Sequence, residues 1–253
     1  MHQILFKYGF FEIRTYGVMV AAAFMISILA ASYFAKKEGI KTDIISDIGL
    51  IAIAGGIIGA RALYVLVGWK SFFSTHIPDI FMVWEGGLVF YGGLIGAFTG
   101  VFIYVLAKKE PFFGIADLLI PFVALGHSIG RLGCFFNGCC YGRADNVHGM
   151  IFPSIGGGVP RLPTQLYESG LNLMNFILLL FLYDKLKQKK GILFFLYVFN
   201  YGIIRVIMET FRGDDERGML FGFSTSTVIS YFMIAAGLAG LIFLWFKYER
   251  KLG

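Results

Sequence analysis

The amino-acid sequence predicts an all-α integral membrane protein with about seven transmembrane helices. Of its 253 residues, 57% are hydrophobic and only 15% are charged, whereas a soluble domain has roughly 45–50% apolar and about 25% charged residues. Apolar runs that match the ~20 residues needed to cross a bilayer recur along the chain. The basic residues behind the net charge of +6 stand in short clusters between these runs. We therefore expect one polytopic membrane domain over residues 1–253 and no nucleic-acid partner.

The apolar runs define the expected spans. The first run, GVMVAAAFMISILAASYFA, follows an aromatic-rich lead and is too long and too late for a cleaved signal peptide. We expect it to remain as the first helix. The seven expected spans are 16–35, 47–67, 87–107, 113–134, 166–183, 191–210 and 226–246.

The basic clusters predict the orientation of the chain. The connections after the first, third and fifth spans read KKEGIK, KKEP and DKLKQKK, and the tail reads KYERKLG. Lys and Arg collect on the cytoplasmic side of membrane proteins. We therefore expect the N-terminus outside, the C-terminus in the cytoplasm and an outward-facing loop region at 135–165.

Five polar residues inside the spans point to a binding site. The orientation places Arg61, His127, Arg131, Arg205 and Glu209 in the outer half of the membrane. A charge at membrane depth costs at least ~2.5–3.5 kcal/mol, so several at one level predict a shared polar cavity. Three arginines against one glutamate favour an anion, and the planar guanidinium matches phosphate oxygens. The anion most available at this depth is a phospholipid headgroup.

A purely structural role stays open for these side chains. Arg205 and Glu209 are four residues apart, as are His127 and Arg131, so each pair lies on one helix face. The first pair is also compatible with a salt bridge that only ties helices together. That role does not explain why the excess charge is positive and lies on one leaflet.

Other polar or small residues have simpler explanations. Asp47 and Asp117 stand near the starts of spans, where a helix N-terminus favours an acid. The glycines of AIAGGIIGA and WEGGLVFYGGLIGAFTG are expected to let helices pack closely. Tyr91 stands between two of those glycine pairs, where its hydroxyl needs a partner.

Two polar segments flank the later spans. Gln165, Tyr167 and Glu168 occupy the start of the fifth span, where interfacial anchoring is one explanation for the tyrosine. The segment FRGDDERG places Arg212 and Arg217 around three acids just beyond the sixth span. Such a charge run is usually a solvated turn, but its position also allows a gate or a headgroup contact.

Several stretches together resemble one family. GRLGCFFNGCCYG resembles GRxGNFxNxExxG, the signature of prolipoprotein diacylglyceryl transferases. The stretches IRTYG (with Tyr16), WEGGLVFYGGLIG, LPTQLYES and RVIMETFR are similar to further family segments in the same order. The matching signature positions are Gly130, Arg131, Gly133, Phe135, Asn137 and Gly142.

The resemblance implies a seven-helix transferase of the bacterial inner (plasma) membrane that acts in lipoprotein biosynthesis. It would transfer the diacylglyceryl group of phosphatidylglycerol to the lipobox cysteine thiol of a prolipoprotein signal peptide, forming a thioether and releasing glycerol 1-phosphate. The family needs no metal or soluble cofactor, and the arginines would neutralise the departing phosphate. The candidate catalytic residues are Arg131, Arg205, Tyr91 and His127; the candidate substrate-binding residues are Tyr16, Arg61, Asn137, Glu168, Glu209 and Arg212.

The chain departs from the family pattern at three positions. Tyr91 stands where the family commonly has histidine, and Cys134 and Cys139 stand where the signature has asparagine and glutamate. A tyrosine acts as a base only if its pKa is strongly lowered. His127 is an alternative base, and which residue takes the proton is left open.

The three cysteines allow several interpretations. The spacing C-x4-C-C lacks the paired pattern of a zinc site, and His148 does not complete one. An oxidising exterior permits a disulfide of Cys134 with Cys139 or Cys140. Packing as small buried residues is equally compatible, whereas a covalent carrier role is disfavoured because the acceptor brings its own thiol.

Two other functions are compatible with the sequence. A divergent relative would move a lipid-derived group to another acceptor, which the three departures favour. A non-enzymatic lipid or anion transporter would also use an arginine pocket. It would need access from both leaflets, yet the inner halves of the spans carry little charge and show no matched pair of broken helices.

Overall fold

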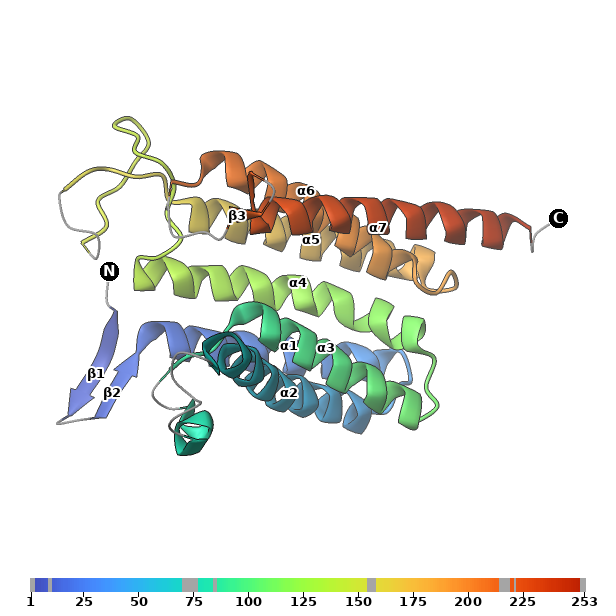
Figure 1. The fold of residues 1–253 in the computed structure, drawn as a ribbon. Helices are drawn as coiled ribbons and strands as arrows, with labels where there is room; N and C mark the ends of the chain where they lie inside the picture. The colour runs from blue at the N-terminus through green and yellow to red at the C-terminus, as the bar shows by residue number, and fades with distance from the viewer. Residues whose placement is uncertain are drawn as a thin grey trace. The chain divides into compact units, whose positions relative to one another are not determined.

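The computed structural model confirms the all-α membrane fold. It describes residues 3–8, 11–69, 77–83, 86–153, 158–213, 219–220 and 222–250. Within these ranges seven helices are long and apolar enough to cross a membrane. They are α1 (Thr15–Lys37), α2 (Thr42–Gly68), α3 (Phe90–Ala107), α4 (Phe112–Asn137), α5 (Thr164–Leu186), α6 (Ile192–Phe211) and α7 (Thr225–Glu249) (Figure 1).

Short elements that the sequence did not indicate accompany the helices. An antiparallel pair, β1 (Ile4–Tyr8) and β2 (Phe11–Arg14), precedes α1. A second pair, β3 (Met219–Leu220) and β4 (Phe223–Ser224), precedes α7. A short 3-10 helix, η2 (Ile77–Phe81), lies between α2 and α3. Apolar periodicity does not predict elements this short, because two to five residues contain too little pattern.

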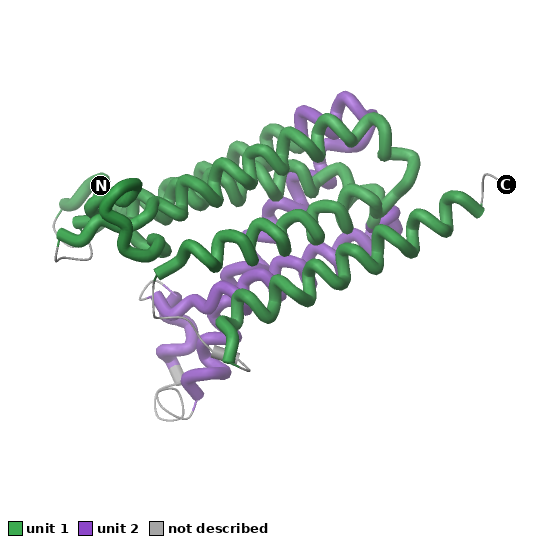
Figure 2. The backbone as a smooth tube through the Cα atoms, turned by 90° about the horizontal axis from the view of Figure 1, so that it is seen from above, with its two compact units in different colours: residues 1–31, 113–253 green, residues 32–112 purple. Residues whose placement is uncertain are grey.

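The chain divides into two compact units. The first unit comprises residues 1–31 and 113–253, and the second comprises residues 32–112 (Figure 2). The second unit contains α2, η2 and α3. The first unit contains α5, α6 and α7 with nearly all of α4, most of α1 and the two strand pairs.

Glycines bring α2 and α3 of the second unit into backbone contact, as the glycine pattern predicts. A Cβ on Gly59 or Gly96 would lie less than 3.0 Å from backbone atoms of the other helix. Gly92 is equally tight against the carbonyl oxygen of Gly59. The hydroxyl of Tyr104 on α3 donates to Oδ2 of Asp47 on α2 at 2.5 Å. Asp47 therefore joins two helices, contrary to the expected role at its own helix start.

Side chains of α4 contact α1, α5 and α6 in the first unit. Gly126 packs on Ser27 of α1, and Ser128 donates to the carbonyl oxygen of Ser169 on α5 at 2.9 Å. The carboxylate of Asp117 accepts from the backbone N–H of Gly191 (2.5 Å) and Phe194 (2.8 Å). Asp117 therefore has the expected N-terminal role, but at α6 and not at its own helix.

Backbone pairing orders the described parts of the connection between α4 and α5, residues 138–153 and 158–163. Gly142 N–H donates to the carbonyl oxygen of Leu162 (2.8 Å), and Arg143 N–H donates to that of Phe211 at the end of α6 (2.9 Å). These bonds hold the C-terminal ends of α4 and α6 and the N-terminal end of α5 together. The side of the membrane on which this connection lies stays a prediction.

Candidate active site

Glu168 lies at the centre of a buried charge cluster formed by three helices. Its side chain, in the second turn of α5, is only 3% exposed. Oε1 lies 2.7 Å from Nη2 of Arg131 on α4, and Oε2 lies 3.6 Å from Nη1 of Arg205 on α6. The side chains of both arginines are also mostly buried. One carboxylate is thus shared by two guanidinium groups.

A second carboxylate completes the cluster. Oε2 of Glu209 lies 3.3 Å from Nη2 of Arg205, one helical turn away. Two arginines therefore face two glutamates. The excess of positive charge expected from the sequence is not found in this cluster, because Glu168 lies inside it.

One donor in the cluster is left without a hydrogen bond. Among the described residues, the buried Nη1 of Arg205 has no hydrogen-bond partner, since Glu168 is too distant at 3.6 Å. An unsatisfied buried donor costs about 1–3 kcal/mol. This atom is a position where a ligand oxygen would be stabilised.

Aromatic and imidazole rings border the cluster. Nε2 of His127 lies 3.9 Å from Oε1 of Glu168, and its ring centroid lies 4.9 Å from that of Tyr201. Tyr201 also lies within electrostatic reach of Arg131 and stacks on Tyr197, with 5.9 Å between ring centroids. Arg131 therefore has a carboxylate as its ion-pair partner and a phenol as a neighbour.

A buried polar face of α5 extends the site into the bundle. Its members are the buried residues Gln165, Glu168, Ser169, Asn172 and Asn175. Nε2 of Gln165 donates to the carbonyl oxygen of Cys139 at 2.6 Å. Polar side chains are costly inside a membrane and usually mark function there, so α5 carries more of the site than the charged residues alone indicate.

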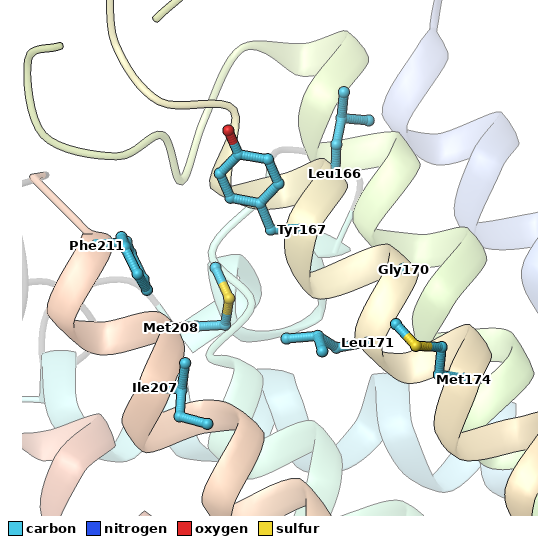
Figure 3. Close-up of a pocket in the computed structure, with 8 residues that line it drawn as sticks. All are labelled: Leu166, Tyr167, Gly170, Leu171, Met174, Ile207, Met208 and Phe211. Atoms are coloured by element: carbon cyan, nitrogen blue, oxygen red, sulfur yellow. The ribbon is translucent and has the colours of Figure 1, made fainter. Parts of the chain in front are cut away.

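An open apolar groove lies between α5 and α6. Its volume is ≈ 480 Å³, and Tyr167, Leu171 and Met208 face it (Figure 3). Tyr167 precedes the buried Glu168, and Met208 precedes Glu209. The same helix segments therefore present charge on one side and an apolar groove on the other. The full lining is Leu166, Tyr167, Gly170, Leu171, Met174, Ile207, Met208 and Phe211.

Arg61 and Tyr91 belong to the second unit. The guanidinium of Arg61 donates to the carbonyl oxygens of Ile80 (2.9 Å), Gly86 (2.7 Å), Gly87 (3.3 Å) and Asp79. It thereby fixes η2 and the two glycines that precede α3 onto α2. The ring of Tyr91 packs edge-to-face on Phe90. Trp84 and Glu85 lie outside the described residues.

The remaining candidate residues gather near the C-terminal end of α4. Tyr16 lies within electrostatic reach of Arg131 and packs beside Gly133. The backbone carbonyl oxygen of Asn137 accepts a hydrogen bond from Nε2 of Gln3 at 2.7 Å. Arg212 pairs through its backbone with Gly142. Residues 214–218, which include Arg217 and its acidic neighbours, lie outside the described residues.

Comparison with known proteins identifies the family. The family model described as prolipoprotein diacylglyceryl transferase matches residues 3–243. The chain belongs to the prolipoprotein diacylglyceryl transferase family. It is 36% identical over 244 residues to the phosphatidylglycerol–prolipoprotein diacylglyceryl transferase of Clostridium tetani, covering 94% of this chain and 96% of the relative. Identity to proteins of the same name is 35% in Nostoc sp. (96% of this chain, 89% of the relative) and 34% in Geobacter sulfurreducens (99% and 96%).

Family membership confirms the resemblance and the multi-pass membrane class. The three cysteines lie in the stretch that the sequence predicts to depart from the family signature. All three thiols are free, and their Sγ atoms lie within 4.8 Å of one another. Neither disulfide considered from the sequence is formed. Hydrogen bonds from the other two thiols, with the charges of Arg212 and Arg131, lower the pKa of Cys140 despite burial.

Sequence reasoning missed several features of the candidate site. It selected Glu168 but not its central position, and it did not select Asn172 or Asn175. The available signal was helical spacing in a mostly apolar run, because Asn172 follows Glu168 by four residues and Asn175 follows Asn172 by three. It also missed the convergence of the three sulfur atoms, because C-x4-C-C is not a usual metal spacing.

Proposed function

We propose that this chain transfers the diacylglyceryl group of phosphatidylglycerol to the lipobox cysteine thiol of a prolipoprotein, forming a thioether and releasing glycerol 1-phosphate. The names of the relatives support the two substrates. The observation that carries the proposal is the pair of buried arginines on Glu168, with Nη1 of Arg205 left without a hydrogen bond. An arginine pair of this kind suits a reaction whose leaving group is a phosphate.

The depth of the cluster matches a lipid headgroup. Arg131 lies six residues from the last residue of α4, Glu168 four residues from the first of α5, and Glu209 two residues from the last of α6. These three helix ends are held together by the 138–163 connection. At 1.5 Å per residue, the cluster lies within ~9 Å of the helix ends. With the N-terminus outside, this depth corresponds to the outer leaflet.

The arginines stabilise the leaving group in the proposed reaction. The acceptor sulfur forms a bond to the glyceryl carbon, while the bond from that carbon to the phosphate oxygen breaks and its electron pair stays on the oxygen. Preorganised donors in a water-poor site stabilise such developing charge strongly. Arg131 and Arg205 are the donors, and Glu168 holds both in position.

The acceptor thiol must lose its proton during the transfer. His127 is the candidate base in the first unit, because its Nε2 lies beside Glu168. A neutral imidazole accepts a proton when the thiol comes within hydrogen-bond reach. Tyr91, at the position where the family commonly has histidine, is the candidate in the second unit.

The other candidate residues have proposed roles in binding. The groove between α5 and α6 would take acyl chains, since its lining is apolar and it flanks the charge cluster. Tyr16, Asn137 and Arg212 would contact the headgroup or the acceptor near the end of α4. Arg61 would contribute by fixing the segment before α3, or by binding the substrate directly.

A reconstituted transfer assay tests the proposal. Wild-type protein, labelled phosphatidylglycerol and a lipobox peptide should yield labelled peptide, and Arg131→Ala and Arg205→Ala should lose the labelling. Arg14→Ala is the matched control, because the side chain of Arg14 is 72% exposed. Unlabelled peptide with wild type, or full labelling with both cluster variants, would contradict the proposal.

A divergent acceptor is the second candidate function. Tyr91, Cys134 and Cys139 favour it because they replace residues of the family pattern. Expression in cells depleted of their own transferase separates the two functions. Restored growth supports the lipobox acceptor, whereas good expression without growth supports another acceptor.

A further inference from the structure

The three cysteines of this chain form a sulfur cluster. Cys134 lies in the last turn of α4, and Cys139 and Cys140 follow the end of that helix. Their Sγ atoms lie within 4.8 Å of one another, and each residue is partly buried. The sequence contains no other cysteine. Every thiol of the protein is therefore gathered at one position.

Hydrogen bonds to α4 and α5 hold the backbone of this cluster. Cys139 N–H donates to the carbonyl oxygen of Cys134 at 3.2 Å. The Thr164 hydroxyl donates to the carbonyl oxygen of Cys140 at 2.9 Å, and Gln165 donates to that of Cys139 at 2.6 Å. The sulfur atoms thus lie on a turn whose position is fixed independently of any bond between them.

Cys140 has an unusual backbone conformation. Its φ is +62°, in the left-handed region that residues other than glycine rarely adopt. Such conformations persist where the surrounding structure enforces them. Here the bond from Thr164 contributes to holding the turn that brings the third sulfur to the other two.

The number of sulfur atoms distinguishes a metal site from a disulfide. A disulfide uses two sulfurs and leaves the third unused, whereas a metal ion uses all three. Zn–S bonds of ≈ 2.3 Å in tetrahedral geometry place sulfur atoms about 3.8 Å apart, so each pair needs to close by only ~1 Å. We propose that Cys134, Cys139 and Cys140 form a site for one thiophilic divalent cation of the zinc class, with an open fourth coordination position.

The charges around the cluster suit this ion. Three thiolates and one divalent cation carry a net charge of −1. Arg131 and Arg212 act on Cys140 electrostatically, and Arg131 also acts on Cys134. Two positive groups beside a singly negative complex stabilise it, and thiolate ligands select soft or borderline ions over magnesium or calcium. The proposal does not depend on the transferase reaction.

Cobalt binding tests the site in the full-length protein. After treatment with a thiol-free reductant and a chelator, one equivalent of Co²⁺ should produce the sulfur-to-cobalt charge-transfer band and the intense visible bands of a tetrahedral thiolate site. Zn²⁺ should remove both. The Cys134→Ser/Cys139→Ser/Cys140→Ser triple variant should lose the bands, and each single variant should weaken them. His148→Gln should keep them, because His148 is an exposed potential ligand outside the cluster.

A second measurement uses the wild-type protein and therefore tests the proposal even if the cysteine variants do not fold. In the reduced wild-type protein, one equivalent of Zn²⁺ should protect all three thiols from an alkylating reagent. Absent cobalt–sulfur bands, or full alkylation in the presence of zinc, would overturn the proposal. So would protein isolated without reductant that has one reactive thiol and a mass lower by two hydrogens, because that result identifies a disulfide.

Discussion

Arg131 and Glu168 form the closest ion pair of the charge cluster, with 2.7 Å between Nη2 and Oε1. The pair joins α4 to α5, and the same carboxylate reaches Arg205 on α6. A single residue of α5 thus sets the position of two arginines on other helices.

Glu168→Gln should lower both stability and activity. Removing one partner of a buried ion pair costs about 3–5 kcal/mol, because the remaining charge is left uncompensated. Here two guanidinium groups lose their shared partner. Thermal unfolding in detergent and the transfer rate measure the two effects. Glu12→Gln is the control, because Glu12 pairs with the exposed Lys7 and Arg14 and such pairs contribute ~0–1 kcal/mol. Equal melting temperatures for Glu168→Gln and wild type would refute the central role of Glu168.

Arg205→Lys should retain part of the activity that Arg205→Ala loses. Lysine keeps the positive charge but not the planar fork that matches phosphate oxygens. Removing one stabilising donor commonly costs ~10²–10³ in kcat, so we expect a loss of that order for the alanine variant and an intermediate rate for lysine. Initial rates of peptide labelling provide the measurement. Equal rates for lysine, alanine and wild type would show that Arg205 does not act on the leaving group.

Asp117→Ala should destabilise the first unit without altering substrate binding. Its carboxylate accepts from two backbone N–H groups at the start of α6, and loss of such a cap costs ~0.5–2 kcal/mol. Thermal unfolding should show the loss, while KM for phosphatidylglycerol stays unchanged. Asp184→Ala is the control, since that side chain is 79% exposed. A changed KM with unchanged stability would contradict the capping role.

Gly59→Ala should destabilise the packing of α2 on α3. The added Cβ meets backbone atoms of Gly92 and Gly96 that cannot rotate away. Overpacking of this kind typically costs 1–3 kcal/mol. Thermal unfolding should report the effect, with Gly17→Ala as the control because a Cβ there meets nothing within 4 Å. Equal stability of the two variants would mean that α2 and α3 move apart to accept the added methyl group at little cost in free energy.

The sequence predicts most of the fold because membrane spans are recognisable from their apolar composition. Runs of apolar residues locate all seven helices, and the family motifs identify the transferase family. The helix ends are less predictable. The second span was expected from residue 47, but α2 begins at Thr42, since the polar first turn carries no apolar signal.

The sequence names candidate residues for the charge cluster but not the contacts between them. Spacing along one helix predicts that Arg205 lies beside Glu209 and His127 beside Arg131, because residues four apart lie on the same helix face. It does not show which helices are neighbours. The central position of Glu168, the cap that Asp117 provides to α6 and the meeting of the three sulfurs all depend on contacts between segments distant in the sequence.

The shared carboxylate of Glu168 has a consequence for turnover. With its own internal anions, the cluster is near electrical neutrality before substrate binds, so it requires no ion from solution. Under the proposed function, the phosphodiester of phosphatidylglycerol carries one negative charge, whereas a phosphate monoester such as the product carries about −1.5 to −2. Glu168 and Glu209 repel the more highly charged product more strongly and compete with it for Arg131 and Arg205. Glu168 and Glu209, which position the arginines for the lipid, thereby also promote release of the glycerol 1-phosphate product.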